Sequence, residues 1–408
     1  MAELYQLPDG WEWKTIDEFA TIKSGKRVPK GKKLLDDVTP YPYIRVTDFA
    51  DNGTVDTLDI KYISEDIYQQ IKNYTITDED IYISVAGTIG KTGIIPSELN
   101  RANLTENAVK IVFDNSKYDK NFIFNFTNSI TFMEQIGLAT KTVAMPKLAI
   151  KRLKEVFIPL PPLEEQKRIV SKLDTLFEKI DKSISLHQKN IDEANVFMAS
   201  VLNDVFVELE EKYERRTVFD LCTKITDGTH ATPKYIDSGV PFLSVKNISQ
   251  GIISFDDTKY VSEEEHLTLS KRCNVERDDI LYTKVGTTGI AKVVDTDIEF
   301  SIFVSIALLK PKKDLISSMY FQHILNSPNC YKQSQNRTRG VANRNLVLND
   351  IKQINFPLPP IQTQQKVVAY LDEISQKIEI LKKAQNDKMQ SLKSLKASIL
   401  DKAFRGEI

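Results

Sequence analysis

The chain reads Phe157-Ile158-Pro159-Leu160-Pro161-Pro162 at one point and Asn355-Phe356-Pro357-Leu358-Pro359-Pro360 at a second. The shift from Pro159 to Pro357 is 198 residues, close to half of the 408-residue chain. The same shift relates other pairs of segments: Lys61-Tyr62 with Lys259-Tyr260, Val143-Ala144 with Val341-Ala342, and Ala199-Ser200-Val201-Leu202 with Ala397-Ser398-Ile399-Leu400. A repeat of this length indicates two copies of one unit rather than a solenoid of short repeats.

Each copy divides into a mixed first part and a helical second part. In the first part, short β-branched and aromatic runs predict strands, and Asp51-Asn52-Gly53 predicts a turn. Examples of these runs are Ile44-Arg45-Val46, Ile81-Tyr82-Ile83 and Ile280-Leu281-Tyr282. After each Pro-Leu-Pro-Pro, the chain continues without Gly or Pro, from residue 163 to about 213 and from 361 to about 404. These stretches predict two long helices, each roughly 65 to 75 Å long at 1.5 Å per residue.

Both predicted helices carry a heptad seam of mostly apolar residues, with polar steps at His187 and Gln385. The seam of the first helix is Leu173, Phe177, Ile180, Ile184, His187, Ile191, Ala194, Met198, Val201 and Val205, and that of the second is Leu371, Ile374, Ile378, Leu381, Gln385, Leu392, Leu395 and Ile399. Neither helix can bury its seam alone, so we expect the two helices to pair. We expect an antiparallel pair because each helix leaves its own domain and one of them must run back to the other domain. The alternative is that each helix packs separately on its own domain.

The predicted fold class is therefore α+β, with two pseudo-symmetric domains of mixed α/β structure separated by two long helices packed as an antiparallel coiled coil. The predicted segments are a first domain at 1–157, a central helix at 158–213, a second domain at 214–355 and a C-terminal helix at 356–408.

The composition is that of an ordinary globular protein. Apolar residues make up 41% and charged residues 27% of the chain, which excludes disordered and collagenous classes. The 55 Lys and Arg balance 56 Asp and Glu, so any nucleic-acid contact must come from a local distribution of charge. Cys222, Cys273 and Cys330 form no CxxC motif and are expected to be reduced and buried in a cytoplasmic protein. No signal peptide or membrane span is expected.

One segment resembles a phosphate-binding loop but has the wrong spacing. Gly87-Thr88-Ile89-Gly90-Lys91-Thr92 places Val85 where the GxxxxGK[ST] motif requires its first glycine. The second copy, Gly286-Thr287-Thr288-Gly289-Ile290, keeps the glycines and loses the lysine. The segment is better explained as a turn, with either a structural role or a contact to a DNA backbone.

The sequence contains no recognisable catalytic or metal-binding motif. The four histidines, His187, His230, His266 and His323, are not at metal-ligand spacing from one another or from a cysteine. The GxSxG and HExxH motifs do not occur. We therefore expect a chain without catalytic, cofactor-binding or metal-binding residues.

Three segments resemble the specificity (S) subunit of a type I restriction-modification system, and the resemblance covers nearly the whole chain. They are Ile158-Pro159-Leu160-Pro161-Pro162-Leu163-Glu164-Glu165-Gln166-Lys167-Arg168-Ile169-Val170, Ser398-Ile399-Leu400-Asp401-Lys402-Ala403-Phe404-Arg405-Gly406-Glu407 and Leu7-Pro8-Asp9-Gly10-Trp11. A fourth, Ile225-Thr226-Asp227-Gly228-Thr229-His230-Ala231-Thr232-Pro233, is similar to the start of a target recognition domain. The first copy departs there with Ile22-Lys23-Ser24-Gly25-Lys26-Arg27, as expected if the two domains read different DNA sequences.

The resemblance implies a noncatalytic subunit that binds double-stranded DNA. Its two target recognition domains would each read one half of a bipartite, asymmetric site, and its helices would fix the gap and dock two methyltransferase (modification) subunits. Adenine-N6 methylation with S-adenosylmethionine, and ATP- and Mg²⁺-dependent cleavage by restriction subunits, would belong to partners. Recognition modules on one face of DNA lie about 34 Å or a multiple apart, so a stiff spacer suits this role.

Candidate DNA contacts are Lys, Arg, Ser, Thr, Asn and His side chains in predicted loops, with one Asp. In the first copy they are Lys23, Ser24, Lys26, Arg27, Lys30, Thr88, Lys91, Thr92, Lys141 and Lys147. In the second copy they are Asp227, Thr229, His230, Thr232, Lys234, Lys246, Asn247, Thr287, Thr288, Arg337, Arg339, Asn343 and Arg344.

Two other functions remain open from the sequence. A coiled-coil scaffold with protein-binding globular ends would show no sequence-selective DNA retention. A P-loop enzyme would bind ATP through Lys91.

Overall fold

The computed structural model describes residues 4–140, 148–340 and 344–408. The chain divides into two compact units. Unit 1 comprises Met1–His187 and Asp387–Ile408, and unit 2 comprises Gln188–Asn386. The four predicted segments treat each long helix as a segment of its own. The two units instead divide each long helix near its middle, and each half belongs to the unit whose core it packs against.

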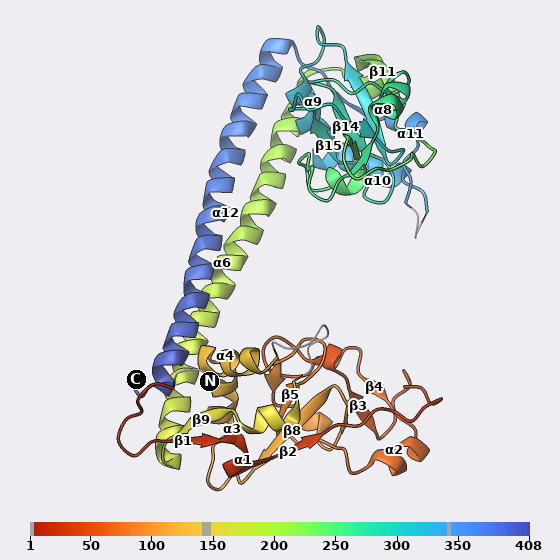
Figure 1. The fold of residues 1–408 in the computed structure, drawn as a ribbon. Coiled ribbons are helices and arrows are strands. Elements are labelled where there is room, and N and C mark those ends of the chain that lie inside the picture. The colour runs from red at the N-terminus through yellow and green to blue at the C-terminus, as the bar shows by residue number, and fades with distance from the viewer. Residues whose placement is uncertain (1–3, 141–147, 341–343) are drawn as a thin grey trace. The chain divides into compact units, whose positions relative to one another are not determined.

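Unit 1 contains three small sheets (Figure 1). The largest is antiparallel with the order β2-β8-β5-β6 and is formed by Ala20–Ser24, Ala108–Phe113, Ile81–Ser84 and Thr92–Gly93. The second has the order β4-β3-β7 and is formed by Lys61–Tyr62, Pro42–Ile44 and Asn103–Leu104. The third pairs β1 (Glu12–Thr15) with β9 (Phe157–Leu160).

Unit 2 repeats this topology strand for strand. The order β11-β17-β14-β15 is formed by Cys222–Asp227, Ile306–Pro311, Ile280–Thr283 and Ala291–Val293. The order β13-β12-β16 is formed by Lys259–Val261, Val240–Leu243 and Ser301–Ile302, and β10 (Arg215–Thr217) pairs with β18 (Asn355–Pro357). The predicted duplication is therefore a duplication of structure.

Short helices surround the sheets of both units. In unit 1 they are α1 (Ile16–Phe19), η1 (Val46–Asp48), α2 (Glu65–Ile71), η2 (Ser97–Leu99), α3 (Lys120–Thr127), α4 (Ile130–Thr140) and α5 (Ile150–Lys154). In unit 2 they are α7 (Val218–Leu221), η3 (Val245–Asn247), α8 (Glu263–Ser270), α9 (Ser318–Leu325), α10 (Pro328–Arg337) and α11 (Leu348–Lys352). The strand predicted at residues 44–46 ends at Ile44, because the next residues form the turn η1.

The two long helices are α6 (Leu163–Lys212) and α12 (Ile361–Phe404), and they pack together as antiparallel partners (Figure 1). Within unit 1, Lys396 pairs with Asp181 at 2.7 Å. Within unit 2, Asn190 Nδ2 donates to Gln385 Oε1 at 3.3 Å. The predicted α+β class with two paired helices is confirmed.

The predicted seam is only partly buried. Leu173 and Leu371 are fully buried, whereas Leu381 is 41% exposed and Leu395 is 48% exposed. A pair of helices covers each seam from one side only, so a seam residue with no further neighbour remains open to solvent.

The repeated Pro-Leu-Pro-Pro segment is joined to each globular part by a buried glutamine. Gln166 Oε1 accepts from the backbone N–H of Asp119 at 2.8 Å, and its Nε2 donates to Pro161 O at 2.8 Å. Gln364 repeats both bonds with Ser317 and Pro359, each at 2.9 Å. Each glutamine thus pairs a carbonyl of the proline turn with the N–H of the residue that caps α3 or α9, so these backbone groups keep their hydrogen bonds.

Candidate nucleic-acid interface

Strand-end site 1 is the place in unit 1 where β2 and β5 end and β8 begins. We define it by Ser24–Arg27, Val85, Thr105–Asn107 and Leu148. Lys26 N–H donates to Leu104 O at 2.8 Å and Val85 N–H to Asn107 O at 2.8 Å. Leu148 N–H donates to Val85 O at 2.9 Å. The backbone therefore brings three loops distant in sequence to one end of the sheet.

Strand-end site 2 is the equivalent place in unit 2, and it is held by the same backbone bonds. We define it by Asp227–His230, Lys284, Phe303–Ser305 and Leu346. Thr229 N–H donates to Ile302 O at 3.2 Å, and Lys284 N–H donates to Ser305 O at 3.0 Å. Leu346 N–H donates to Lys284 O at 2.7 Å. The two sites thus have one scaffold, and residues can be matched between them by these bonds.

Glycine is required at one matched position of both sites. A Cβ atom on Gly25 would lie 2.0 Å from Thr105 O, and one on Gly228 would lie 2.0 Å from Ile302 O. No side chain can be accommodated at this distance from a backbone oxygen. These glycines therefore allow the loop after β2 or β11 to lie directly against the loop before β8 or β17.

Site 1 contains an exposed ion pair beside a pocket. Arg27 Nε lies 2.5 Å from Glu106 Oε1, with side-chain exposures of 77% and 26%. A pocket of about 410 Å³ lies next to this pair, lined by Ser24, Val85, Glu106, Val109, Leu148, Ala149 and Ile150. Burial alone would raise the pKa of Glu106, but hydrogen bonds from Arg27, from its own amide and from Thr105 lower it below the ordinary value. Glu106 is therefore a carboxylate at neutral pH.

Site 2 contains a buried carboxylate with three basic partners. Asp227 is 3% exposed. Its carboxylate lies 2.5 Å from Arg272 Nη2, 3.3 Å from Lys284 Nζ and 3.3 Å from His230 Nε2. Lys284 is itself 5% exposed, whereas the side chain of His230 is 62% exposed. Asp227 and Lys284 match Ser24 and Val85 of site 1, so the same scaffold carries different charges in the two units.

The glycine turn after β5 or β14 borders each site and is a hairpin. Gly87 and Gly90 have φ values of +78° and +86°, and Gly286 and Gly289 have +77° and +91°. Lys91 pairs with Asp51 at 2.7 Å. The glycines thus allow the left-handed backbone of a turn. The hairpin therefore gives no support to a P-loop.

The predicted contacts of unit 1 fall into an exposed group and a group with internal partners. The exposed group, besides Arg27, is Lys23, Ser24, Lys26, Lys30 and Thr88. Lys26 Nζ lies 5.5 Å from the ring centre of Tyr74. Thr92 is 4% exposed and lies 2.7 Å from the Thr127 hydroxyl, so it has an internal partner, as Lys91 does in Asp51. Lys141 and Lys147 lie outside the described residues.

In unit 2, the described residues of the basic loop, 337–340 and 344, lie beside the glycine hairpin. Gly286 N–H donates to Arg344 O at 2.9 Å, and Thr288 lies 3.0 Å from the Thr338 hydroxyl. Arg339 pairs with Asp350 at 3.3 Å, and Arg337 Nη1 donates to Gln333 O at 3.1 Å. Thr287, Arg339 and Arg344 are exposed, Arg337 is half-buried and Thr288 is buried. Asn343 lies outside the described residues.

The remaining predicted contacts of unit 2 differ in accessibility. Thr232 and Lys234 are exposed, and Thr229 is half-buried. Lys246 is paired with Asp257 at 2.8 Å. Asn247 is 4% exposed, and its Oδ1 accepts from Ser244 N–H at 2.9 Å, which closes the turn η3. The structure therefore gives Asn247 an internal role.

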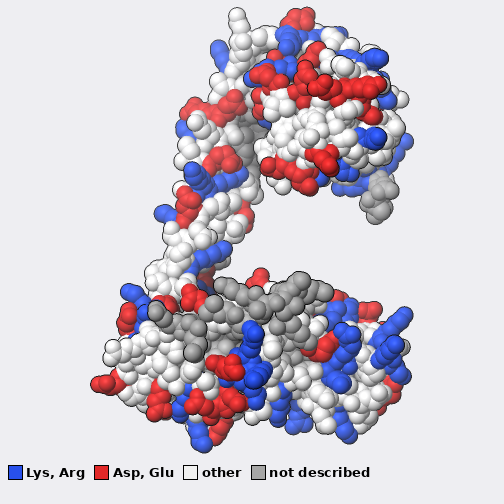
Figure 2. All heavy atoms as spheres, viewed as in Figure 1, with Lys and Arg blue, Asp and Glu red and all other residues white. Residues whose placement is uncertain are grey.

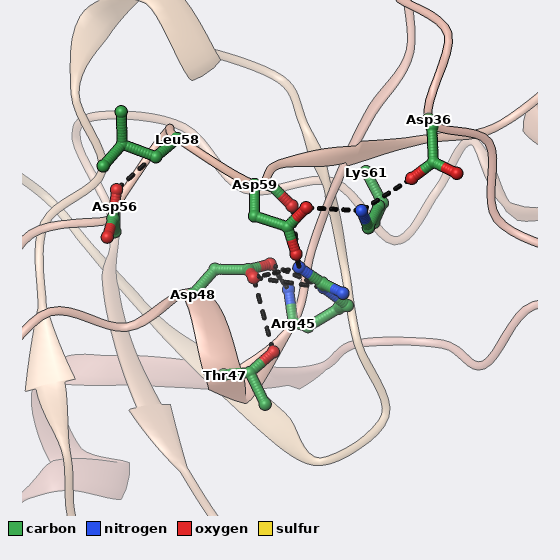
Figure 3. Close-up of polar contacts among 8 residues, drawn as sticks. All are labelled: Asp36, Arg45, Thr47, Asp48, Asp56, Leu58, Asp59 and Lys61. Carbon is green, nitrogen blue, oxygen red and sulfur yellow. Dashed lines mark hydrogen bonds and ion pairs between the residues drawn. The ribbon is translucent and has the colours of Figure 1, made fainter. Parts of the chain in front are cut away.

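The matched turn of unit 1 contains an arginine that the sequence reasoning did not single out (Figure 3). Arg45 Nη2 lies 2.6 Å from Asp48 Oδ1 and 3.2 Å from Asp59 Oδ2. Lys61 contacts Asp59 as well and lies 2.6 Å from Asp36. The guanidinium of Arg45 is thus held by carboxylates of its own domain, so we assign it to the structure of the turn.

Comparison with known proteins identifies the family. A profile described as "Type I restriction modification DNA specificity domain" matches residues 8–193 and 210–390. The chain belongs to this family. The matched residues include both strand-end sites of this specificity-domain protein.

Similar proteins match over nearly the full length of this specificity-domain chain. The type I restriction enzyme EcoBI specificity subunit of Escherichia coli is 27% identical, over 99% of this chain and 88% of that protein. A solved chain from work on complex assembly and conformational transition of the type I R-M system is 22% identical, with a TM-score of 0.74, and covers 99% of this chain and 100% of its own. The HsdS subunit of Thermoanaerobacter tengcongensis is 22% identical, with a TM-score of 0.52 and 99% of each chain covered. These structures share the fold.

Charged residues of both signs are interspersed over both units of the specificity-domain chain in the view of Figure 2. Among the residues described, no group of three or more His, Cys, Asp or Glu side chains could hold a metal ion. No helix in the described part of the chain is long and apolar enough to cross a membrane.

The sequence reasoning missed Glu106, Arg272 and Lys284 as parts of the strand-end sites. Glu106 lies 79 positions from Arg27, and Arg272 lies 45 positions from Asp227. None of the three belongs to a motif, so only the fold brings them to the site. The departure of Ser24-Gly25-Lys26-Arg27 from Asp227-Gly228-Thr229-His230 was the available signal, since both segments keep the glycine and change the charges.

Proposed function

We propose that the chain is a noncatalytic DNA-recognition subunit of a type I restriction-modification complex, in which each unit reads one half of a bipartite site. The observation that carries this proposal is the pair of strand-end sites, which share a backbone scaffold and differ in their charged side chains. Two domains that recognise different half-sites need a common scaffold with different side chains, because the scaffold positions the loops and the side chains select the bases. Family membership favours this function over a coiled-coil scaffold.

The long helices are proposed to set the gap between half-sites and to dock two methyltransferase subunits. An open apolar groove on the helix pair in unit 2 supports docking. It is lined by Ala194, Phe197, Ile374, Ile378 and Leu381 among others, and Phe197 is 56% exposed. An apolar groove of this kind suits the apolar face of a partner helix.

The chemistry is proposed to reside in the partners. S-adenosylmethionine would be bound by the methyltransferase subunits, and ATP and Mg²⁺ by the restriction subunits, in the cytoplasm. The role of this chain in that chemistry would be to bind DNA and to position the methyltransferases on it.

The proposal is tested by co-expressing the chain with its methyltransferase subunit in a host that lacks other adenine methylation. We expect genome-wide mapping of methylated adenines to reveal one bipartite motif with a fixed gap. Expression of the methyltransferase alone is the control and is expected to give no motif. The absence of a motif with both subunits present, or a motif without a gap, would contradict the proposal.

The basic loop of unit 2 is expected to contribute to DNA affinity. Reversing the charge at Arg337, Arg339 and Arg344 should weaken binding by the assembled methyltransferase complex. It should also lower the slope of log affinity against log salt by up to about 1 for each side chain that no longer neutralises a phosphate. Binding should be measured between about 50 and 200 mM salt, the range over which the neutralisation of phosphates changes affinity most clearly. An unchanged affinity and slope would remove this loop from the interface.

A further inference from the structure

Arg27 and His230 occupy the same position on the shared scaffold. Arg27 follows Lys26, whose N–H donates to Leu104 O in site 1. His230 follows Thr229, whose N–H donates to Ile302 O in site 2. Each is also exposed and bonded to a carboxylate of its own site. The carboxylates come from different elements, Glu106 from the loop before β8 and Asp227 from the end of β11. Position and exposure are therefore shared, while the chemistry differs.

The guanidinium of Arg27 is held at one nitrogen and open at the other two. Nε bonds to Glu106, and no hydrogen bond to either Nη atom occurs among residues 4–140, 148–340 and 344–408. The side chain is 77% exposed. Two open Nη groups in a fixed plane match O6 and N7 of guanine in the major groove. Glu106, which also accepts from the Thr105 hydroxyl at 3.1 Å, fixes that plane.

The imidazole of His230 presents different chemistry at the same position. Its Nε2 lies 3.3 Å from Asp227, which is also bonded to Arg272 and Lys284. A carboxylate with cationic partners accepts hydrogen bonds, so Nε2 carries the proton and a neutral ring leaves Nδ1 as an acceptor. An acceptor suits an amino group on a base edge, which is N4 of cytosine or N6 of adenine.

The contrast between the units argues against a merely structural role for these pairs. The loops of both sites are held by backbone bonds that do not involve Arg27, Glu106 or His230. The position of Glu106 is occupied by Val304 in unit 2, and the loop before β17 keeps the same bond through Ser305. The exposed pairs are therefore not needed to hold the scaffold.

We propose that Arg27 and His230 are specificity-determining residues, each selecting one base of its own half-site, with Glu106 and Asp227 as their positioning residues. Arg27 selects a guanine, and His230 selects a base with an amino group in the major groove. This inference rests on the proposed function, because it assumes that each unit reads a half-site.

The test maps methylated adenines for the full chain co-expressed with its methyltransferase subunit. In Arg27→Ala, we expect discrimination for guanine at one position of one half-site to fall by about 5- to 150-fold. The other half-site and the gap should be unchanged. Arg27→Lys keeps the charge but loses the rigid planar pair of donors, so it should relax the same position less than Arg27→Ala does. Glu106→Gln should relax that position to a smaller extent, and His230→Ala should relax one position of the other half-site.

Lys117→Ala is the matched control, because Lys117 is an exposed cation, 70% accessible, after the opposite end of β8. The methylation motif of the Lys117→Ala complex should equal that of the wild-type complex. An unchanged motif in Arg27→Ala overturns the proposal. So does a uniform loss of methylation at an unchanged Tm, because that is the result expected of a residue that binds a phosphate. A wild-type pair that yields no bipartite motif contradicts the proposed function instead.

Discussion

At the residue scale, the charged cluster of site 2 is expected to be strongly coupled. Asp227→Asn would remove the negative charge that lies 3.3 Å from the buried Lys284 ammonium, and the Val304 carbonyl, also 3.3 Å away, is neutral and cannot replace it. Leaving one charge of a buried pair without its partner costs about 3 to 5 kcal/mol. We therefore expect Asp227→Asn to lower the free energy of unfolding by that amount in urea titrations.

A double-mutant cycle checks this coupling. Adding Lys284→Met to Asp227→Asn should recover most of the loss, because replacing a buried ion pair by an apolar group is often neutral. Lys246→Met is the exposed control, because Lys246 pairs at 2.8 Å with an Asp257 that is 96% exposed, and it should cost about 0 to 1 kcal/mol. Additive effects at positions 227 and 284 would show that the two charges do not interact.

The three cysteines are expected to be unreactive in the folded chain. They are unpaired and buried, as expected from the sequence, and burial raises the pKa of Cys222 to about 12, of Cys273 to about 11 and of Cys330 to about 12. At about pH 8.5, iodoacetamide should modify none of them in the native protein and all three in urea, as counted by mass spectrometry. Modification of native Cys273 at the rate of an unfolded thiol would contradict this prediction.

The same shifts predict a loss of stability at alkaline pH. The unfolded thiols release their protons above about pH 8.5 while the folded thiols retain theirs, so the folded state binds more protons. Stability should therefore fall as the pH rises from about 8.5 toward the raised values. Cys273→Ala should show a shallower fall than the wild type, measured as the urea midpoint at about pH 8 and pH 10. Comparing the two proteins cancels the contribution of Tyr82 and Tyr282, whose pKa values burial also raises.

At the element scale, the two faces of α6 should respond differently to truncation. Leu173 is fully buried in the core of unit 1, whereas Leu186 on the same helix is 53% exposed. Leu173→Ala should cost about 2 to 5 kcal/mol, because apolar packing is removed and a cavity forms. Leu186→Ala should cost less than about 1 kcal/mol. Equal losses in denaturant titrations would mean that the seam does not bury α6 as described.

The helices were more predictable from the sequence than the site was. The absence of Gly and Pro and the Pro-Leu-Pro-Pro start located α6 and α12 to within about one residue, because these signals are local. Burial along the seam was less predictable, as Leu381 and Leu395 show, because it depends on what covers the pair. The partners of Arg27 and Asp227 were not predictable, because they depend on loops that only the fold brings together.

At the scale of the whole molecule, the length of the paired helices is expected to set the gap in the DNA site. Inserting seven residues after His187 in α6 and seven after Asn386 in α12 keeps the heptad register and adds about 10 Å of helix. At 3.4 Å per base pair, the preferred gap should lengthen by about three base pairs, with both half-sites unchanged. The motif should be mapped by sequencing methylated adenines.

The insertion in α6 alone is the control for this experiment. It shifts one helix past the other and should lower the thermal stability of the complex rather than define a new gap. If the complex with both insertions still methylates sites that have the original gap and both original half-sites, the helices do not determine the spacing.

The core of unit 1 has a consequence for how the chain is made. Phe404 lies 5.1 Å from the ring of Phe122 and 5.0 Å from that of Phe126, and its carbonyl accepts from the Tyr5 hydroxyl across 399 positions of sequence. At about 5 to 20 residues per second, Tyr5 is added roughly 20 to 80 s before Phe404. Until Phe404 has been added, Phe122 and Phe126 of the first unit therefore lack this packing partner. A nascent chain released early would keep that apolar surface exposed to chaperones and proteases.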